Sequence, residues 1–290
     1  MASLPIELLF QVMEALDYSH PSAYDRSTSI VDTLCQLSLV SRSFHAAATP
    51  HLYRSVALVG SASTSDFART MSESEKHTHV RVILFDRLWE EVDLIPDICT
   101  ILHAVAPSLQ RLFVAFPLIS GRHHFDDDVL RAFDKLSLHN LVEFVSERHN
   151  YNGLIMRDYP VMESRWVRLR RLALHDCTIN DHHIATLSTL PALEIVAYLS
   201  ALQRWDQPLT APLPPSLLRQ VIILQTFPFF DEVVTYFNRM GVERGAPVAV
   251  TTILPPLGTR AASFAWTIRQ VAAGKLWEAD KYEGAVTTLG

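Results

Sequence analysis

Apolar residues in the first fifth of the chain recur at the three- and four-residue spacing of one helical face. The pattern covers residues 4–16 and resumes over residues 30–44, and a helix-favouring stretch then continues to Pro50. The polar residues 17–29 between the two patterns lack periodicity and include Pro21, so they predict a loop. Two or three short helices are therefore predicted, and they carry too many apolar residues to bury among themselves.

After Gly60, short β-rich runs alternate with helical patterns. The runs share the spacing apolar-x-x-apolar-x-apolar, most clearly at Leu169, Leu172 and Leu174, and their first positions lie about 24 to 32 residues apart. The runs begin at Val80, Leu109, Leu141, Leu169, Leu193, Leu218 and Val248. Helical patterns occupy residues 65–76, 93–105, 126–136, 181–190, 229–240 and 262–273.

A strand, a crossover helix and a second parallel strand bury one apolar face per unit, and stacked units form a solenoid. The alternation therefore predicts a mixed α/β fold. A helical module of residues 1–58 is followed by an irregular leucine-rich-repeat-like α/β solenoid over residues 59–290. Its strands would line an open concave face. A compact α/β domain with a mostly parallel sheet gives the same alternation. Pro107, Pro191 and Pro214 precede three of the runs, which favours a repeated unit.

The N-terminal pattern resembles the F-box, in the version common in fungal proteins. The resemblance rests on Leu4-Pro5, Glu7-Leu8-Leu9, Leu34, Leu37, Leu39, Val40, Arg42, Phe44 and Leu52-Tyr53-Arg54. It covers about a fifth of the chain directly. The later alternation is similar to the leucine-rich-repeat tails that such proteins often carry. The loop at 17–29 departs from the family, because it is about a dozen residues longer than the usual connection, although lengthening a surface loop costs little.

The resemblance implies a three-helix module that docks on a Skp-type adaptor, itself held by a cullin scaffold. The chain would then be a substrate-recruiting adaptor of a ubiquitin ligase, and its solenoid would bind the target protein. The residues expected to bind the Skp-type adaptor are Leu4, Pro5, Leu8, Leu34, Leu37, Val40 and Phe44. Some of them are expected to face the core of the module instead, and spacing alone does not assign which.

Composition adds few constraints. The net charge is -6 and Lys and Arg are scattered along the chain, so no nucleic-acid footprint is expected. No run approaches 18 uncharged apolar residues, and the first residues form no signal or transit peptide, so no membrane association is expected. The three cysteines lie far apart without a CxxC pair. We therefore expect a reducing compartment, the cytosol or the nucleus.

Candidate chemistry is sparse. His123 and His124 are adjacent, as are His182 and His183, and neighbours of this kind point in different directions, so no metal site is predicted. Cys177 follows a β-rich run and is interpreted as a turn residue. No phosphate-binding or nucleophile motif is present. We expect no cofactor and no catalytic residue. Two alternatives remain open: a scaffold protein without a ubiquitin role, and an enzyme built on a compact α/β sheet.

Overall fold

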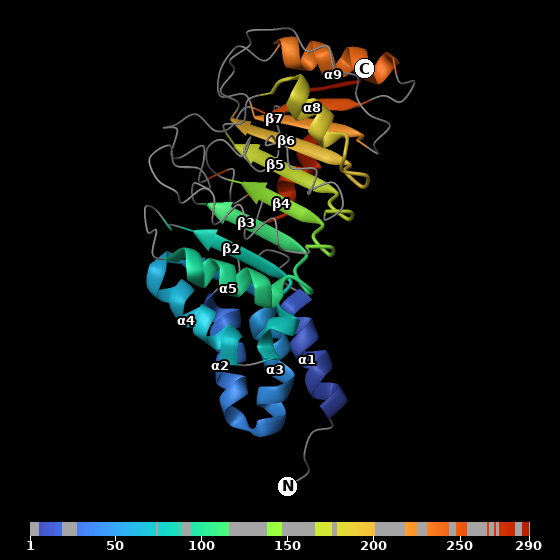
Figure 1. Ribbon diagram of the computed structural model, residues 1–290. Helices are drawn as coiled ribbons and strands as arrows, with labels where there is room; N and C mark the ends of the chain where they lie inside the picture. Colours follow the sequence, from blue (N-terminus) through green and yellow to red (C-terminus); the bar gives the residue numbers. More distant parts are fainter. Residues whose placement is uncertain are drawn as a thin grey trace.

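The chain forms a helical lobe followed by one long sheet (Figure 1). The computed structural model describes residues 6–18, 28–73, 75–86, 88, 94–115, 138–146, 166–175, 179–200, 218–224, 231–243, 248–253, 266, 270, 273–281 and 286–289. The lobe contains α1 (Ile6–Tyr18), α2 (Thr28–Val40) and α3 (Arg42–Arg54). The predicted helices are therefore present, and of the predicted loop, residues 19–27 lie outside the described part of the chain.

In the described residues nine strands form one sheet, and each strand pairs with the next along the chain. The strands are β1 (Ser55–Val59), β2 (Val82–Asp86), β3 (Arg111–Ala115), β4 (Glu143–Ser146), β5 (Arg171–His175), β6 (Ile195–Ser200), β7 (Gln220–Leu224), β8 (Ala249–Ile253) and β9 (Val286–Leu289). The pairs from β1 to β8 are parallel, and β9 runs antiparallel to β8. The prediction of a mixed α/β fold with a parallel sheet is confirmed. β9 was not foreseen.

The same short segment precedes most of the strands. In the clearest cases a tight turn ends on a buried leucine, as where the Leu141 N–H donates to the Leu138 carbonyl at 3.0 Å and the Leu169 N–H to the Trp166 carbonyl at 3.0 Å. The residue after that leucine then donates its N–H to the equivalent residue of the preceding unit. Arg170, for example, donates to the carbonyl of Val142 at 2.9 Å. The first apolar residue of the runs from Val80 to Leu193 therefore ends a turn, and the strand begins two residues later.

The two faces of the sheet bury separate sets of side chains. On the first face, strand residues such as Phe85, Phe144 and Tyr198 join one continuous cluster with the helices. These helices are α4 (Gly60–Glu73), α5 (Ile95–Val105), α8 (Asp181–Leu187) and α9 (Asp231–Glu243). Figure 1 shows α5 and α8 on the same side of the strands. The first face is thus a helix-covered core, as crossover connections require.

On the second face, the described part of the C-terminal segment packs against the strands, and it includes the 3₁₀ helix η3 (Lys275–Lys281). Leu276 and Trp277 are buried there, and Trp266 is partly buried against the same cluster. Small residues at the middle of the sheet, Ala173 and Ala197, belong to this cluster and are fully buried. The face was expected to be an open concave surface. It is covered because these apolar strand residues pack against the returning segment.

The lobe and the sheet are joined without a linker. α3 ends at Arg54 and β1 begins at Ser55, so the last residues of the range 1–58 that we assigned to the helical module form a strand of the sheet. The Arg54 carbonyl accepts a hydrogen bond from Arg81 N–H at 2.9 Å, which starts the ladder between units. Tyr53 stacks on Phe67 of α4, with ring centroids 6.4 Å apart. The end of α3 is therefore part of both regions.

Several predicted helix bounds need correction. The helical pattern over residues 30–44 breaks at Ser41, between α2 and α3. Two other shifts lie at the joint between the lobe and the sheet. The helix expected to stop at Pro50 continues to Arg54, because Leu52 packs on the lobe core and Tyr53 on the sheet core. α4 begins at Gly60, earlier than expected, and the positive φ of 76° at this glycine allows the chain to turn directly out of β1. The helix predicted over residues 126–136 lies outside the described residues, as does most of that over 262–273.

Candidate functional site

The helical lobe has a small core of its own. Leu9 and Met13 of α1, Leu34 of α2 and Ala47 of α3 are buried in it, together with Ala48. Ser41 separates α2 from α3: its side chain accepts a hydrogen bond from the Phe44 N–H at 3.3 Å and caps α3. The two alanines let α3 approach the other helices closely. The lobe is therefore an ordered module, although its core is small.

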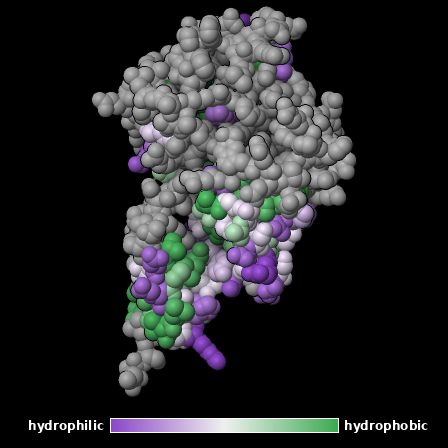
Figure 2. All heavy atoms as spheres, turned by 90° about the vertical axis from the view of Figure 1, so that its left-hand side faces the viewer, coloured by the Kyte–Doolittle hydropathy of each residue, from purple (hydrophilic) through white to green (hydrophobic). Residues whose placement is uncertain are grey.

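Several large apolar side chains of the lobe face solvent. In α1 the exposed fractions are 44% for Leu8, 41% for Phe10 and 49% for Val12, and in α2 they are 84% for Leu39 and 64% for Val40. Figure 2 shows apolar surface gathered over this lobe. Leu8 and Val12 are four residues apart and lie on the same side of α1. We call Leu8, Phe10, Val12, Leu39 and Val40 the exposed apolar set.

The predicted adaptor-binding residues fall into three groups. Leu8 and Val40 are exposed. Leu37 and Phe44 are half-buried against the module core, and Leu34 is fully buried within it, so Leu34 has no surface to offer a partner. Leu4 and Pro5 lie outside the described residues. The structure adds Phe10, Val12 and Leu39, which sequence spacing did not single out as binding residues, although Leu39 belongs to the resemblance.

The charges around the exposed apolar set are mainly acidic. Glu7 and Glu14 of α1 and Asp32 of α2 are exposed, and neither helix contains Lys or Arg. Basic side chains of the lobe come from α3, where Arg42 and Arg54 are exposed. An apolar surface with an acidic rim is typical of a protein-docking site rather than of a site that binds nucleic acid.

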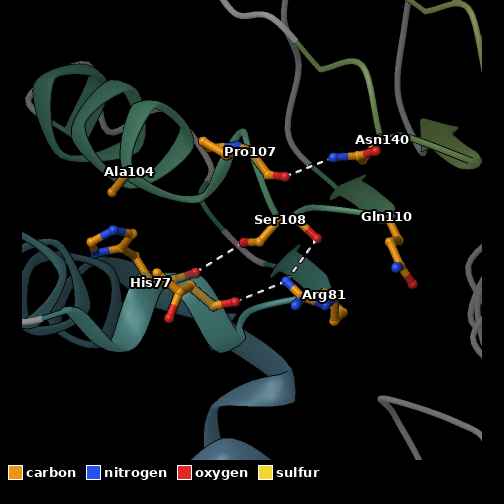
Figure 3. Close-up of a pocket in the computed structure, with 8 residues that line it drawn as sticks. His77, Arg81, Ala104, Pro107, Ser108, Gln110 and Asn140 are labelled. Atoms are coloured by element: carbon orange, nitrogen blue, oxygen red, sulfur yellow. Dashed lines mark hydrogen bonds between the residues drawn. The ribbon is translucent and has the colours of Figure 1, made fainter.

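A separate pocket lies at the edge where the strands begin. It has a volume of about 450 Å³ and lies among the 3₁₀ helix η1 (Glu75–His79), the end of α5 and the turn before β4 (Figure 3). Ser108 Oγ donates to the carbonyls of His77 and Val80 at 2.9 and 2.8 Å. Asn140 Nδ2 donates to the Pro107 carbonyl at 2.7 Å. These bonds fix the walls of the pocket, so the Ser108 and Asn140 side chains hold its turns in place.

Other candidate chemistry stays weak in the part of the chain that the structure describes. No group of three or more His, Cys, Asp and Glu side chains is arranged to hold a metal ion there. His175 is buried at the end of β5, and Cys177 lies outside the described residues. The described helices include none that is both long and apolar enough to cross a bilayer.

The lobe therefore has the build of a small helical docking module: three helices, a small core and a group of exposed apolar side chains. Comparison with protein families shows that it is an F-box-like domain, with the family model matching residues 1–59. No curated protein matches the chain. The family match confirms the resemblance of the N-terminal region, and it covers about a fifth of the chain.

An F-box-like domain implies a Skp-type adaptor as a binding partner. Proteins with this domain are usually adaptors of ubiquitin ligase complexes and are usually not enzymes themselves. The exposed apolar set lies within the matched residues, so the part of the chain that defines the family also presents the apolar surface that a partner would cover.

Proposed function

We propose that the protein is a substrate-recruiting adaptor of a Skp-cullin-type ubiquitin ligase. The helical module would dock on the Skp-type adaptor, which a cullin scaffold holds, and the sheet region would bind the target protein. The chain then contributes proximity, because another subunit carries out the chemistry. The single observation that carries this proposal is the exposed apolar set of an F-box-like domain, whose five members are each at least 41% exposed.

We assign adaptor docking to Leu8 and Val40, with Phe10, Val12 and Leu39 as additional contacts. Large apolar side chains are the usual anchors of a helical module in another protein's groove. Leu37 and Phe44 would support this surface from the module core. Leu4 and Pro5 stay in the proposal on the resemblance alone.

We further propose that the sheet region is an irregular leucine-rich-repeat-like solenoid of the type found behind F-boxes in fungal proteins. Three features support it. Successive strands pair in chain order, a buried leucine or valine lies two residues before each strand from β2 to β7, and hydrogen bonds link each pre-strand segment to the next. Stacked identical contacts of this kind are the basis of solenoid stability.

The joint between the two regions suits an adaptor that must hold its target at a fixed place. α3 runs into β1 without a linker, and Lys76 Nζ donates to the Tyr53 hydroxyl at 3.2 Å across the joint. We place the protein in the cytosol or the nucleus. An exposed free thiol at Cys35 fits a reducing compartment.

The test is a titration of the full-length protein against an immobilised, purified Skp-type adaptor. Wild type should bind, and Leu8→Asp and Val40→Asp should each weaken binding about tenfold or more, because each places a charge in an apolar contact. Val167→Asp and Val242→Asp are matched controls, since both valines are exposed on the sheet region. The controls should bind like wild type.

Two results would contradict the proposal. If wild type does not bind the adaptor, the ubiquitin-ligase role is wrong, and an interaction protein with another partner remains. If Leu8→Asp and Val40→Asp bind like wild type while their circular dichroism is unchanged, the docking surface lies elsewhere on the module.

A further inference from the structure

Arginines line the edge of the sheet where the strands begin. Arg81, Arg170 and Arg219 directly precede β2, β5 and β7, while Arg111 and Arg171 are the first residues of β3 and β5. Arg168 lies in the turn before β5. We call these six arginines the basic edge. The units of β2, β3, β5 and β7 contribute one to three of them each, so the sequence alone shows scattered basic residues.

Two glutamates on this edge are each shared between two arginines. Arg111 Nη2 lies 2.9 Å from Glu143 Oε1, and Arg171 Nη1 lies 3.5 Å from Glu143 Oε2. In the same way Glu194 contacts Arg170 at 2.6 Å and Arg219 at 3.0 Å. Six arginines and two glutamates carry a formal charge of +4, in a chain whose net charge is -6. The adjoining η1 adds no net charge to this sum, because Glu75 and Lys76 carry opposite charges.

Much of this positive charge is accessible. The side chains of Arg170 and Arg219 are 54% and 65% exposed, and Arg168 is exposed as well. Arg168 Nη1 donates to Asn140 Oδ1 at 2.8 Å, and Asn140 lines the pocket beside Ser108. Figure 3 shows Arg81 and Asn140 on opposite sides of that pocket. The pocket and the exposed arginines therefore form one continuous polar surface.

The second face of the sheet is not available to a target protein. Its central side chains, such as Val145, Ala197 and Ile222, are at most 1% exposed beneath the C-terminal segment. The Arg171 guanidinium lies 5.8 Å from the Trp277 ring centroid, so the covering segment reaches up to the basic edge. A partner of the sheet region meets this edge rather than the apolar face.

We propose that the basic edge binds an acidic segment of a partner protein. The inference deepens the proposed function, on which it rests, by naming the class of target that the sheet region would recruit. An extended peptide is favoured over a nucleic acid because Glu194, whose side chain is partly exposed, interrupts the row of arginines. A nucleic-acid backbone carries a charge at every phosphate and would meet this glutamate, whereas a peptide places acidic residues only where arginines lie.

The spacing of the arginines defines the expected pattern. Among the exposed arginines, Arg168 and Arg170 lie beside β5 and Arg219 lies beside β7, two strands further along the sheet. Since neighbouring strands are about 4.8 Å apart, the two groups are separated by about 10 Å. An extended chain spans that distance in about three residues. A matching segment has two pairs of acidic residues with about three neutral residues between them.

The probe is the fluorescein-labelled peptide Glu-Glu-Gly-Ser-Gly-Glu-Glu. Its binding to the full-length protein is measured by fluorescence anisotropy. The control peptide has glutamine in place of glutamate. The protein should bind the glutamate peptide and not the glutamine peptide. The affinity should fall about tenfold or more between low salt and an ionic strength of about 0.15 M, because exposed charges are screened.

The triple variant Arg168→Glu, Arg170→Glu, Arg219→Glu should lose about tenfold or more in affinity, since charge reversal on a binding rim weakens electrostatic association. Its matched control is Arg42→Glu, Arg69→Glu, Arg239→Glu, which changes the net charge equally at exposed positions away from the edge. The control should bind like wild type. If the triple variant is poorly folded, the single variant Arg168→Glu, at an exposed residue in the turn before β5, takes its place. It should also bind the glutamate peptide more weakly than wild type.

Several results would overturn the inference: no binding of the glutamate peptide, equal binding of the glutamine peptide, equal loss in both triple variants, or tighter binding of a ten-nucleotide single-stranded RNA. Adaptor binding is measured on the same samples. The basic-edge variant should still bind the adaptor, and Leu8→Asp should still bind the peptide. A failure of peptide binding is therefore distinct from a failure of adaptor docking.

Discussion

The helical module and the sheet region differ in how far each completes its own core. Among the described residues the module buries five apolar side chains in its core, whereas forty form the helix-covered core of the sheet region. The second face of the sheet is also buried, and Leu276 and Trp277 of the C-terminal segment belong to its cluster. The module leaves Leu39 and Val40 largely exposed. The difference indicates that the module needs a partner for its apolar surface, while the sheet region offers a polar edge.

The first prediction concerns the core of the sheet. Phe144 is fully buried in β4, with its ring centroid 5.1 Å from that of Trp166. Phe144→Ala should lower the free energy of unfolding by about 3–5 kcal/mol, because it removes a large buried side chain and leaves a cavity. Urea unfolding followed by tryptophan fluorescence measures the change. Val167→Ala, at an exposed position in the adjoining turn, should change it by less than about 0.5 kcal/mol.

The second prediction concerns the smaller core. Leu34→Ala should destabilise the module by about 2–4 kcal/mol, since Leu34 is fully buried among the three helices. Its effect should be local: amide hydrogen exchange should accelerate in α1 and α2 and stay unchanged in β3–β7. Leu39→Ala is the surface control and should leave exchange as in wild type. Equal acceleration throughout the sheet would show that the two regions unfold as one unit.

The third and smallest prediction concerns the basic edge. A hydrogen bond from Arg170 lowers the pKa of Glu194 below its ordinary value of 4.5, although partial burial opposes the shift. A lowered pKa in the folded state stabilises the protein above pH 4.5, and this contribution is lost as the pH falls through the folded pKa. Glu194→Gln should cost less than about 1 kcal/mol at pH 7, because the pair is near the surface.

The free energies of unfolding of wild type and Glu194→Gln are measured by denaturation at several pH values. The difference between them should be present at pH 7 and should shrink below pH 4.5. A difference that grows on acidification would contradict the assigned pairing of Glu194 with Arg170 and Arg219.

The strands could be predicted from the sequence because each run repeats the same alternation of apolar residues that are buried on one face of the sheet. The run starting at Leu169 has Leu172 and Leu174 two residues apart on the strand, and both are buried on the first face. Strand bounds could not be predicted as well, since Leu169 itself is buried in the turn and looks like a strand residue. β9 was missed because its pairing with β8 is made only by the returning chain.

The docking residues were harder to predict. Apolar residues surround α1, with Leu8, Leu9, Phe10, Val12 and Met13 in six positions, so helical period does not separate a core face from a surface face. Only packing on α3 shows that Leu9 and Met13 are buried.

The basic edge and the closed second face depend on residues far apart in the chain. Arg81 and Arg219 share one edge only because parallel strands place equivalent positions of successive units side by side. Trp277 reaches Arg171 only because the C-terminal segment returns across the sheet. Neither the shared edge nor the contact between Trp277 and Arg171 leaves a signal in local sequence patterns.

The most direct test of the central claim is amide hydrogen exchange of the full-length protein alone and with a saturating Skp-type adaptor. A partner that binds the folded module stabilises it against local opening, so exchange should slow there. The account predicts slower exchange in α1, α2 and α3, with β3–β8 unchanged. Slower exchange confined to the sheet region, or no change anywhere at saturation, would contradict the claim that the helical module is the docking site.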